Sequence, residues 1–145
     1  MSNPSIPAGF VVLDRTSPYI QAMGPFYWKV DGKQRIVAIR AEEKHVNSRG
    51  FVHGGVLCGL ADLAIGYNLA YLQEPPLPLV TANLTVDFAG AARKGDWLEC
   101  RVDIQRVGGR LAYANAYVWR GEDRIVRASA IFARSDDGGR KAEGG

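Results

Sequence analysis

The sequence predicts an α+β domain in which one antiparallel sheet wraps around one long central helix. A nearly uncharged apolar stretch of helical length runs from about Phe51 to Tyr71, and Pro75, Pro76 and Pro78 end it. Segments with alternating apolar and polar residues follow, as in antiparallel strands with one covered face. One long helix followed by a run of strands is typical of an α+β arrangement.

The segments before the long helix predict a lead-in and a hairpin. We expect residues 1–16 to be a lead-in and Pro18–Met23 to form a short helix. Phe26–Val30 and Arg35–Ala41 are expected to be paired strands, because the turn sequence Asp31-Gly32-Lys33 separates them.

Alternating residues after the helix predict further strands, at Val80–Phe88, Leu98–Gln105, Leu111–Trp119 and Ile125–Ala133. The residues expected on the covered face of the first strand are Val80, Ala82, Leu84, Val86 and Phe88. In the third strand, small side chains leave room for the helix at Ala112, Ala114 and Ala116. Its other face carries aromatic residues and suggests contact with another copy of the chain, through Tyr113, Tyr117 and Trp119.

Length and composition predict a single globular domain. The chain has 145 residues, of which 47% are hydrophobic and 23% charged. We assign the domain to residues 1–134 and expect the polar, glycine-rich segment 135–145 to be disordered. The net charge of +3 suits an anionic ligand but is too small to indicate binding of nucleic acid.

The sequence also predicts a cytoplasmic protein that does not enter membranes. The N-terminus lacks the basic start and apolar run of a signal peptide. Cys58 and Cys100 lie in apolar patterns typical of free thiols in a reducing compartment. Residues 51–72 are long enough to span a membrane, but Asp62 and Asn68 interrupt them, and a buried helix is the better interpretation.

The motif Asn47-Ser-Arg-Gly50-Phe-Val-His53-Gly54-Gly55 stands at the start of the long helix. The N–H groups of Gly54 and Gly55 lie in the first helical turn, where they have no acceptor within the helix. The positive end of the helix dipole adds to them, so they can bind an oxygen that becomes negatively charged during a reaction.

Asp62 is a lone acid on the apolar helix. No Lys or Arg lies three or four residues away, so a local ion pair does not explain it. Gly59 and Gly66 remove bulk on nearly the same face and leave room for a ligand. A structural role, in which Asp62 bonds a backbone group or a strand, fits the pattern equally well. Together with the amide donors, a carboxylate indicates acyl-transfer or hydrolytic chemistry.

The length of the helix constrains how these groups can cooperate. Gly54 and Asp62 are eight residues apart, or about 12 Å along a helix axis. One carbonyl cannot contact both groups of the same chain. If both act on one substrate, they come from two chains, and a two-fold dimer with two equivalent sites is expected.

Other chemistries fit the sequence less well. Cys58 as a nucleophile with His53 as its base is disfavoured, because residues five apart on a helix point in different directions. His45 and His53 are too few and too poorly spaced for a zinc site. We therefore expect no metal.

The motif from Asn47 to Gly55, with Leu60-Ala61-Asp62 after it, resembles the PaaI-type acyl-CoA thioesterases of the hotdog fold. Ala92-Arg93-Lys94-Gly95-Asp96 and Arg106-Val107-Gly108 also fit that family, and the resemblance covers about Ser17 to Ala133. It implies a hotdog fold and hydrolysis of a CoA thioester without a cofactor, since coenzyme A is part of the substrate. It also implies a homodimer with shared sites, assembled as a dimer of dimers.

The resemblance assigns catalytic roles to four residues. Asp62 is expected to be the nucleophile or the general base for water, and the amide of Gly54 of the partner subunit is the oxyanion donor. Asn47 is expected to help hold the carbonyl or the attacking water, and His53 to shape the turn.

The resemblance also implies a substrate-binding set. Some family members carry a hydroxyl that assists hydrolysis at the positions of Gly66 and Thr81, and here only Thr81 can supply it. Gly55 completes the helix start. Four basic residues are candidates for the CoA phosphates, with ordinary surface charge as the alternative for each: Arg93, Lys94, Arg106 and Arg110. The acyl group is expected near the helix glycines and near Leu57, Ala61 and Tyr67.

Two alternatives use the same fold. A non-catalytic acyl-CoA sensor or carrier would bind the thioester without cleaving it, although such a binder has no need of an acid near the carbonyl. A dehydratase would need an Asp/His pair that has no clear counterpart in this sequence.

Overall fold

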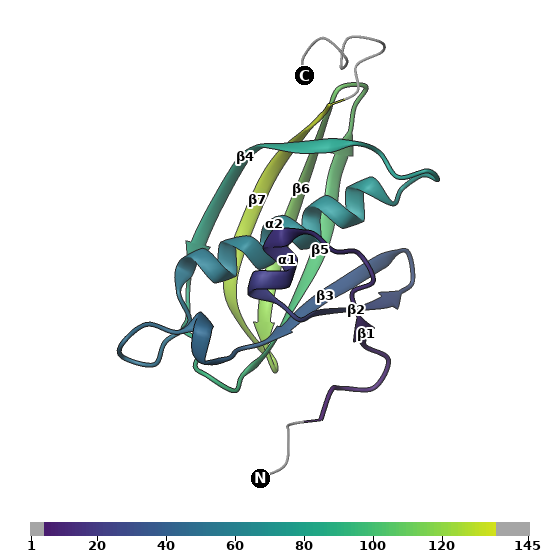
Figure 1. Ribbon diagram of the computed structural model, residues 1–145. Helices are drawn as coiled ribbons and strands as arrows, with labels where there is room; N and C mark the ends of the chain where they lie inside the picture. Colours follow the sequence, from purple (N-terminus) through teal and green to yellow (C-terminus); the bar gives the residue numbers. More distant parts are fainter. Residues whose placement is uncertain (1–4, 136–145) are drawn as a thin grey trace.

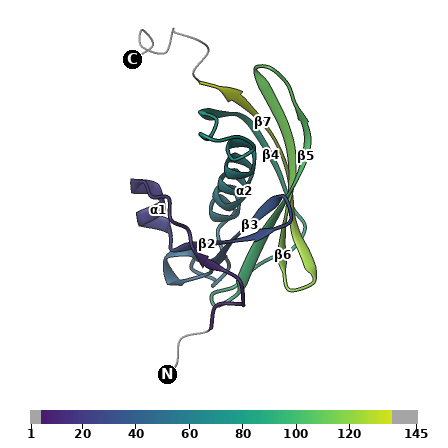
Figure 2. The same cartoon turned by 90° about the vertical axis from the view of Figure 1, so that its right-hand side faces the viewer.

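The computed structural model describes residues 5–135, in which seven strands form one antiparallel sheet in the order β1-β2-β3-β5-β6-β7-β4. The strands are β1 (Val11–Val12), β2 (Phe26–Asp31), β3 (Gln34–Arg40), β4 (Leu79–Phe88), β5 (Trp97–Val107), β6 (Leu111–Arg120) and β7 (Asp123–Arg134). The helices are α1 (Pro18–Met23), the 3₁₀ helix η1 (Glu43–His45) and α2 (Gly54–Ala70). Figure 1 shows α2 crossing one face of the sheet, and Figure 2 shows the sheet curving around it. The predicted sheet wrapped around one long helix is confirmed.

The core lies between α2 and the inner face of the sheet. The buried residues of α2 are mostly aliphatic, with Leu60, Ala61, Ala64 and Ile65 fully covered. The alanines predicted to lie against the helix are buried on β6, which contacts α2. Small side chains there let the helix approach the sheet closely. Each large aliphatic side chain buried between helix and sheet stabilises the folded state by about 1.5–3 kcal/mol.

Helix α2 begins at Gly54, three residues after the predicted start. Phe51 and Val52 are extended and form isolated bridges, to Arg93 and Val46 respectively. His53 is the N-cap residue, with φ −61° and ψ 141°. The apolar pattern could not distinguish these extended residues from a helical turn, because both would be apolar at this position.

The expectation of a buried helix holds for only one side of α2 in the single chain, because a helix that packs on a single sheet has only one side covered. Asp62 lies on the other side and is half-buried, as are Gly54, Cys58, Gly59 and Gly66. The free energy cost of a carboxylate there is therefore smaller than in a core.

Strand β4 contains a β-bulge that changes which of its residues face the helix. Thr81 pairs with Phe132 of β7, and Asn83 pairs with Ile131, so Ala82 is an extra residue. Phe132 is buried on the helix side, and its partner Thr81 therefore also faces α2. The predicted inward direction is correct from Leu84 onward but wrong for Val80, which is 52% exposed. A local alternation pattern cannot show where one residue is inserted.

The predicted lead-in is more ordered than a connecting segment. Within it, β1 pairs with β2, and Phe10 and Leu13 are buried. The tail predicted to be disordered lies outside the described residues, except for Ser135, whose N–H donates to the carbonyl of Pro78. Within residues 5–135, no helix is long and apolar enough to cross a membrane.

One buried polar side chain ties α2 to the β2–β3 hairpin. The Asn68 Oδ1 accepts a hydrogen bond of 2.9 Å from the Arg35 N–H. Its Nδ2 donates to the carbonyls of Arg35 at 2.9 Å and Ala64 at 2.8 Å. Asn68 thus pairs both the backbone N–H and the backbone carbonyl of Arg35, which is half-buried.

We predict that Asn68→Ala lowers the free energy of unfolding by about 2–4 kcal/mol, because it leaves the half-buried N–H and carbonyl of Arg35 unpaired and opens a cavity at a buried position. Urea unfolding at one fixed protein concentration measures this change. Asn115→Ala is the matched control: Asn115 lies on the outer sheet face without a side-chain hydrogen bond in the described chain, so its loss should cost less than about 0.5 kcal/mol. Equal stability of the two variants would contradict the role given to Asn68.

Candidate active site

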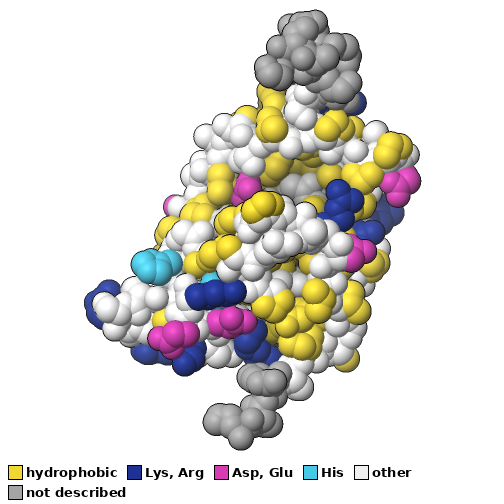
Figure 3. All heavy atoms as spheres, viewed as in Figure 1, with side chains coloured by type: hydrophobic (Ala, Val, Ile, Leu, Met, Phe, Trp, Pro, Cys, Tyr) yellow, Lys and Arg dark blue, Asp and Glu magenta, His cyan; other side chains and the backbone are white. Residues whose placement is uncertain are grey.

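A groove runs along the open side of α2, beside the beginning of β4. Its volume is about 630 Å³, and residues of α2, the 76–78 segment and β4 line it, together with Arg15 and Phe132. Figure 3 shows hydrophobic side chains exposed in the hollowed part of this face. Its walls are therefore largely apolar, as in sites for small organic ligands.

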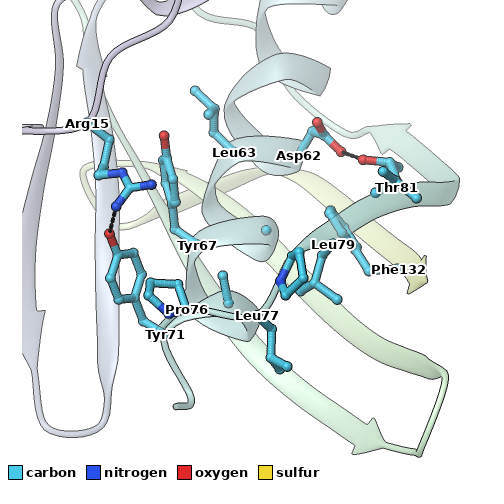
Figure 4. Close-up of a pocket in the computed structure, with 14 residues that line it drawn as sticks. Arg15, Asp62, Leu63, Tyr67, Tyr71, Pro76, Leu77, Leu79, Thr81 and Phe132 are labelled. Atoms are coloured by element: carbon cyan, nitrogen blue, oxygen red, sulfur yellow. Dashed lines mark hydrogen bonds between the residues drawn. The ribbon is translucent and has the colours of Figure 1, made fainter. Parts of the chain in front are cut away.

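Asp62 and Thr81 meet at one end of this groove (Figure 4). The Thr81 hydroxyl donates a hydrogen bond of 2.6 Å to Asp62 Oδ1. The bulge in β4 makes this contact possible, because it turns Thr81 toward the helix. Gly66 follows Asp62 by one helical turn, and a Cβ there would lie 3.3 Å from the ring of Phe132. The predicted grouping of Asp62, Gly66 and Thr81 is thus present in one groove.

The loop from Asn47 to His53 holds the start of α2 in place. Asn47 Oδ1 accepts hydrogen bonds from the N–H groups of Arg49 at 2.9 Å and Phe51 at 3.1 Å. Gly50, with φ 86°, is in the left-handed region that glycine adopts readily. Asn47 therefore organises the loop through its carbonyl oxygen, which leaves its Nδ2 group to donate elsewhere.

Gly54 is the first residue of α2, so its N–H has no acceptor within the helix. The ring of Phe88 lies close to it, and a Cβ on Gly54 would be 3.1 Å from that ring. Gly55 is exposed beside it. Because α2 is continuous from Gly54 to Ala70, the amide of Gly54 remains about 12 Å from Asp62 along the axis. One chain does not bring these two groups together.

The two histidines have different surroundings. His45 is fully buried; its Nδ1 accepts from the Glu42 N–H, and its Nε2 donates to the carbonyl of Met23 at 2.7 Å. Both ring nitrogens are thus used, one at the N-cap residue of η1 and the other at the end of α1. His53 is exposed, and its N–H donates to the carbonyl of His45. Within the described residues, no three His, Cys, Asp or Glu side chains come together as metal ligands would.

The four basic residues predicted to bind phosphates do not form one cluster. Arg93 stacks on Phe51 with its guanidinium 4.4 Å from the ring centroid, near the start of α2. Lys94 forms an exposed ion pair of 2.8 Å with Glu43. Arg106 and Arg110 lie around the turn between β5 and β6, and Arg110 lines a small cavity near Leu69 at the other end of α2.

The expected acyl contacts are only partly correct. Leu57 and Ala61 are buried on the side of α2 that faces the sheet, so they do not line the groove. The helical period places them there, opposite the glycines. Tyr67 does line the groove, where burial raises the pKa of its hydroxyl.

Two residues that lie beside the open side of α2, Arg15 and Tyr19, are not predicted by the sequence patterns. Arg15 lines the groove at the end away from Asp62. Tyr19 of α1 places its hydroxyl against Gly59, where a Cβ would overlap with the oxygen. Burial and the charge of Asp62 raise the pKa of Tyr19. No local pattern places Arg15 or Tyr19 beside the open side of α2, since both contacts depend on the tertiary fold.

Cys58 lies one turn before Asp62 on α2, and burial raises the pKa of its thiol. A raised pKa reduces the thiolate fraction at neutral pH and so disfavours Cys58 as a nucleophile. Cys100 is fully buried in β5, and burial raises its pKa to about 12. Both cysteines are free thiols.

Comparison with solved structures shows the same fold. The Escherichia coli PaaI protein from the phenylacetic acid degradation operon matches with a TM-score of 0.73 and 20% identity, over 81% of this chain and 84% of that chain. A hypothetical thioesterase from Streptococcus pneumoniae, solved with coenzyme A, matches with a TM-score of 0.69 and 18% identity, over 75% of this chain and 84% of its own. The predicted hotdog fold is confirmed by these similarities.

Sequence comparison gives the family. A family model described as "Thioesterase superfamily" matches residues 49–127, which include the motif loop from Arg49 onward, α2 and the strands from β4 to the middle of β7. A Pseudomonas aeruginosa protein named "Putative esterase PA0474" is 44% identical over 129 residues, or 88% of this chain and 96% of that protein. The chain therefore belongs to the thioesterase superfamily.

Proposed function

We propose that this protein is an acyl-CoA thioesterase that hydrolyses a CoA thioester to the free acid and coenzyme A. The observation that carries this proposal is the hydrogen bond between Thr81 and Asp62 at the end of an apolar groove. A carboxylate held by a hydroxyl beside an apolar cavity is suited to activate water next to an acyl group. The family and the coenzyme A in the Streptococcus pneumoniae structure support a CoA ester as substrate.

The proposed reaction begins when Asp62 removes a proton from a water molecule. The water oxygen attacks the thioester carbonyl carbon, and the carbonyl oxygen becomes an oxyanion that the Gly54 N–H of the partner subunit binds. The C–S bond then breaks, and the CoA thiolate leaves and takes up a proton. In the other form of the mechanism, an Asp62 oxygen attacks the carbonyl carbon directly, and the C–S bond breaks with loss of the CoA thiolate. Water then cleaves the resulting mixed anhydride to the free acid and the Asp62 carboxylate.

The proposal needs two copies of the chain because Gly54 and Asp62 lie about 12 Å apart along α2. The sheet offers a place for the second copy, because β4 is an edge strand of ten residues. Val80 is 52% exposed there and Phe88 is 51% exposed. A second β4 paired antiparallel with this edge would cover both and set the two α2 helices side by side.

A further association of dimers is part of the proposal. The aromatic residues predicted on the outer sheet face are half-buried in the single chain, and Arg124 lies over Tyr117 at 4.5 Å and Trp119 at 5.5 Å. Arg124 therefore covers part of this aromatic surface. In a dimer of dimers, the part of the surface that Arg124 leaves exposed would form the contact between the two dimers.

We predict that Asp62→Asn lowers kcat for acyl-CoA hydrolysis by at least about a hundredfold, because it removes the proton acceptor but keeps the size of the side chain. Thr81→Val should lower kcat by about ten- to a hundredfold, since a hydrogen bond to a charged group is lost, and Thr81→Ser should retain most activity. Release of free thiol from a series of acyl-CoA esters measures these rates.

The same measurements, made on the unaltered protein and on the variants, distinguish a thioesterase from a non-catalytic sensor or carrier. Tight binding of acyl-CoA by the unaltered protein, without release of thiol, would support the sensor. Activity of Asp62→Asn close to that of the unaltered protein would refute the role of Asp62. Circular dichroism confirms in each case that the variant is folded.

We predict that mixing two inactive variants restores activity through hybrid dimers. Gly54→Pro removes the amide donor, and the first helical turn tolerates proline after the extended His53. A hybrid of Gly54→Pro with Asp62→Asn carries one intact site out of two. Random exchange at equal amounts should therefore restore about one quarter of full activity.

The matched control for this experiment is Gly54→Ala, which adds a Cβ next to Phe88 but keeps the N–H group. If the amide matters, Gly54→Ala should stay far more active than Gly54→Pro, whose loss is expected to be about a hundredfold or more. Exchange of subunits is verified by native mass spectrometry of differently tagged chains. No recovery despite exchange would indicate that each site lies within one chain.

A further inference from the structure

The groove that begins at Asp62 and Thr81 ends at an arginine. Arg15 reaches it from the segment between β1 and α1 and donates a hydrogen bond of 2.9 Å to the Tyr71 hydroxyl. Its guanidinium carbon also lies 5.8 Å from the centroid of the Tyr71 ring. The contact with one tyrosine thus holds a charged group at the groove wall while leaving most of its donors free.

A second guanidinium adds positive charge on the same tyrosine. Arg35 of β3 lies 4.8 Å from the centroid of the Tyr71 ring and 4.5 Å from that of Trp28. Within residues 5–135, the ion pairs join other residues and include neither Arg15 nor Arg35. Two cations that meet on one ring without an ion-paired carboxylate form a place where an anion is favoured.

Of the two arginines, Arg15 lines the groove together with Tyr67 and Tyr71, whereas Arg35 contacts Tyr71 without lining it. Burial raises the pKa of the Tyr67 hydroxyl, whereas the charge of Arg15 acts in the opposite direction. Asp14 and Tyr71 also raise this pKa, so Asp14 offsets part of the charge of Arg15. Asp14 is nevertheless exposed and forms no ion pair in the described chain.

The spacing of residues along α2 gives the length of a ligand that would reach from Asp62 at one end of the groove to Arg15 at the other. Tyr67 and Tyr71 follow Asp62 by five and nine residues, which correspond to about 7.5 and 13.5 Å along the axis. Between the ends, the wall is mostly apolar and includes Leu63, Ala70, Leu79 and Phe132, with the Tyr67 hydroxyl as a polar group. A methylene chain fits such a wall, whereas the several amide groups of a pantetheine arm would find few partners there.

We propose that Arg15 binds the distal carboxylate of a dicarboxylic acyl group whose thioester carbonyl lies at Asp62 and Thr81. The substrate class is then the CoA monoester of a straight dicarboxylic acid with about six to ten carbons, from C–C bonds of about 1.5 Å and the rise of the helix. This assignment rests on the proposed thioesterase function. Arg15 does not take part in bond breaking and determines specificity.

The test compares matched pairs of substrates that differ only in the distal carboxylate: adipoyl-CoA with hexanoyl-CoA, suberoyl-CoA with octanoyl-CoA, and sebacoyl-CoA with decanoyl-CoA. For the unaltered protein, kcat/KM should be at least about tenfold higher for the dicarboxylic member of the best pair. Arg15→Gln should abolish this preference mainly through KM, and Arg15→Lys should retain part of it because the charge is kept.

Arg124→Gln is the matched control, because Arg124 likewise stacks on aromatic rings but lies on the outer face of the sheet. It should leave the preference unchanged. An equal ratio of dicarboxylic to monocarboxylic kcat/KM in the unaltered protein and in Arg15→Gln would overturn the proposal. An equal rise of KM for both members of every pair would also overturn it, and would assign Arg15 to a phosphate of coenzyme A instead.

A binding measurement separates this proposal from the proposed function. Free suberate should raise the melting temperature of the unaltered protein more than free octanoate does, and Arg15→Gln should lose that difference. If no CoA ester is hydrolysed but this suberate effect is present, the thioesterase assignment fails while the anion site stands. If hydrolysis occurs and suberate has no effect that depends on Arg15, the anion site fails alone.

Discussion

The inner face of the sheet is covered by one unbroken helix, and this packing determines where the candidate functional groups lie. Burial of Leu60 and Ile65 and the hydrogen bonds of Asn68 fix α2 against the strands. Because α2 is rigid and advances by about 1.5 Å per residue, its open side presents groups at fixed intervals. These are an amide at Gly54, a carboxylate at Asp62 and aromatic rings near the end.

Much of the architecture could be predicted because its physical causes are local. Alternation of apolar and polar residues located β5, β6 and β7 to within a few residues, since one face of each strand is covered. The prolines after Tyr71 located the end of α2, because proline cannot continue a helix. The alanines of β6 indicated the close helix contact through their size alone. Asp62 could be identified as a candidate because it is a carboxylate on an apolar helix with no nearby Lys or Arg to form an ion pair.

Other features depend on contacts between residues far apart in the sequence, and local sequence patterns could not predict them. The extended Phe51 and Val52 are held by bridges to Arg93 and Val46, so the local sequence did not reveal the true helix start. Arg15 reaches the groove only because the segment before α1 packs near Tyr71, 56 residues later. The roles assigned to Asn47, His53 and the basic residues remain predictions.

The bulge in β4 has a consequence for the alignment of related sequences. Thr81 faces α2 only because Ala82 is an extra residue relative to β7. A relative that lacked this residue would present the side chain of a neighbouring position to its own helix carboxylate. An ungapped alignment would then match Thr81 with a residue on the opposite face of the strand. Equivalence in this strand is therefore better defined by pairing with β7 than by sequence position.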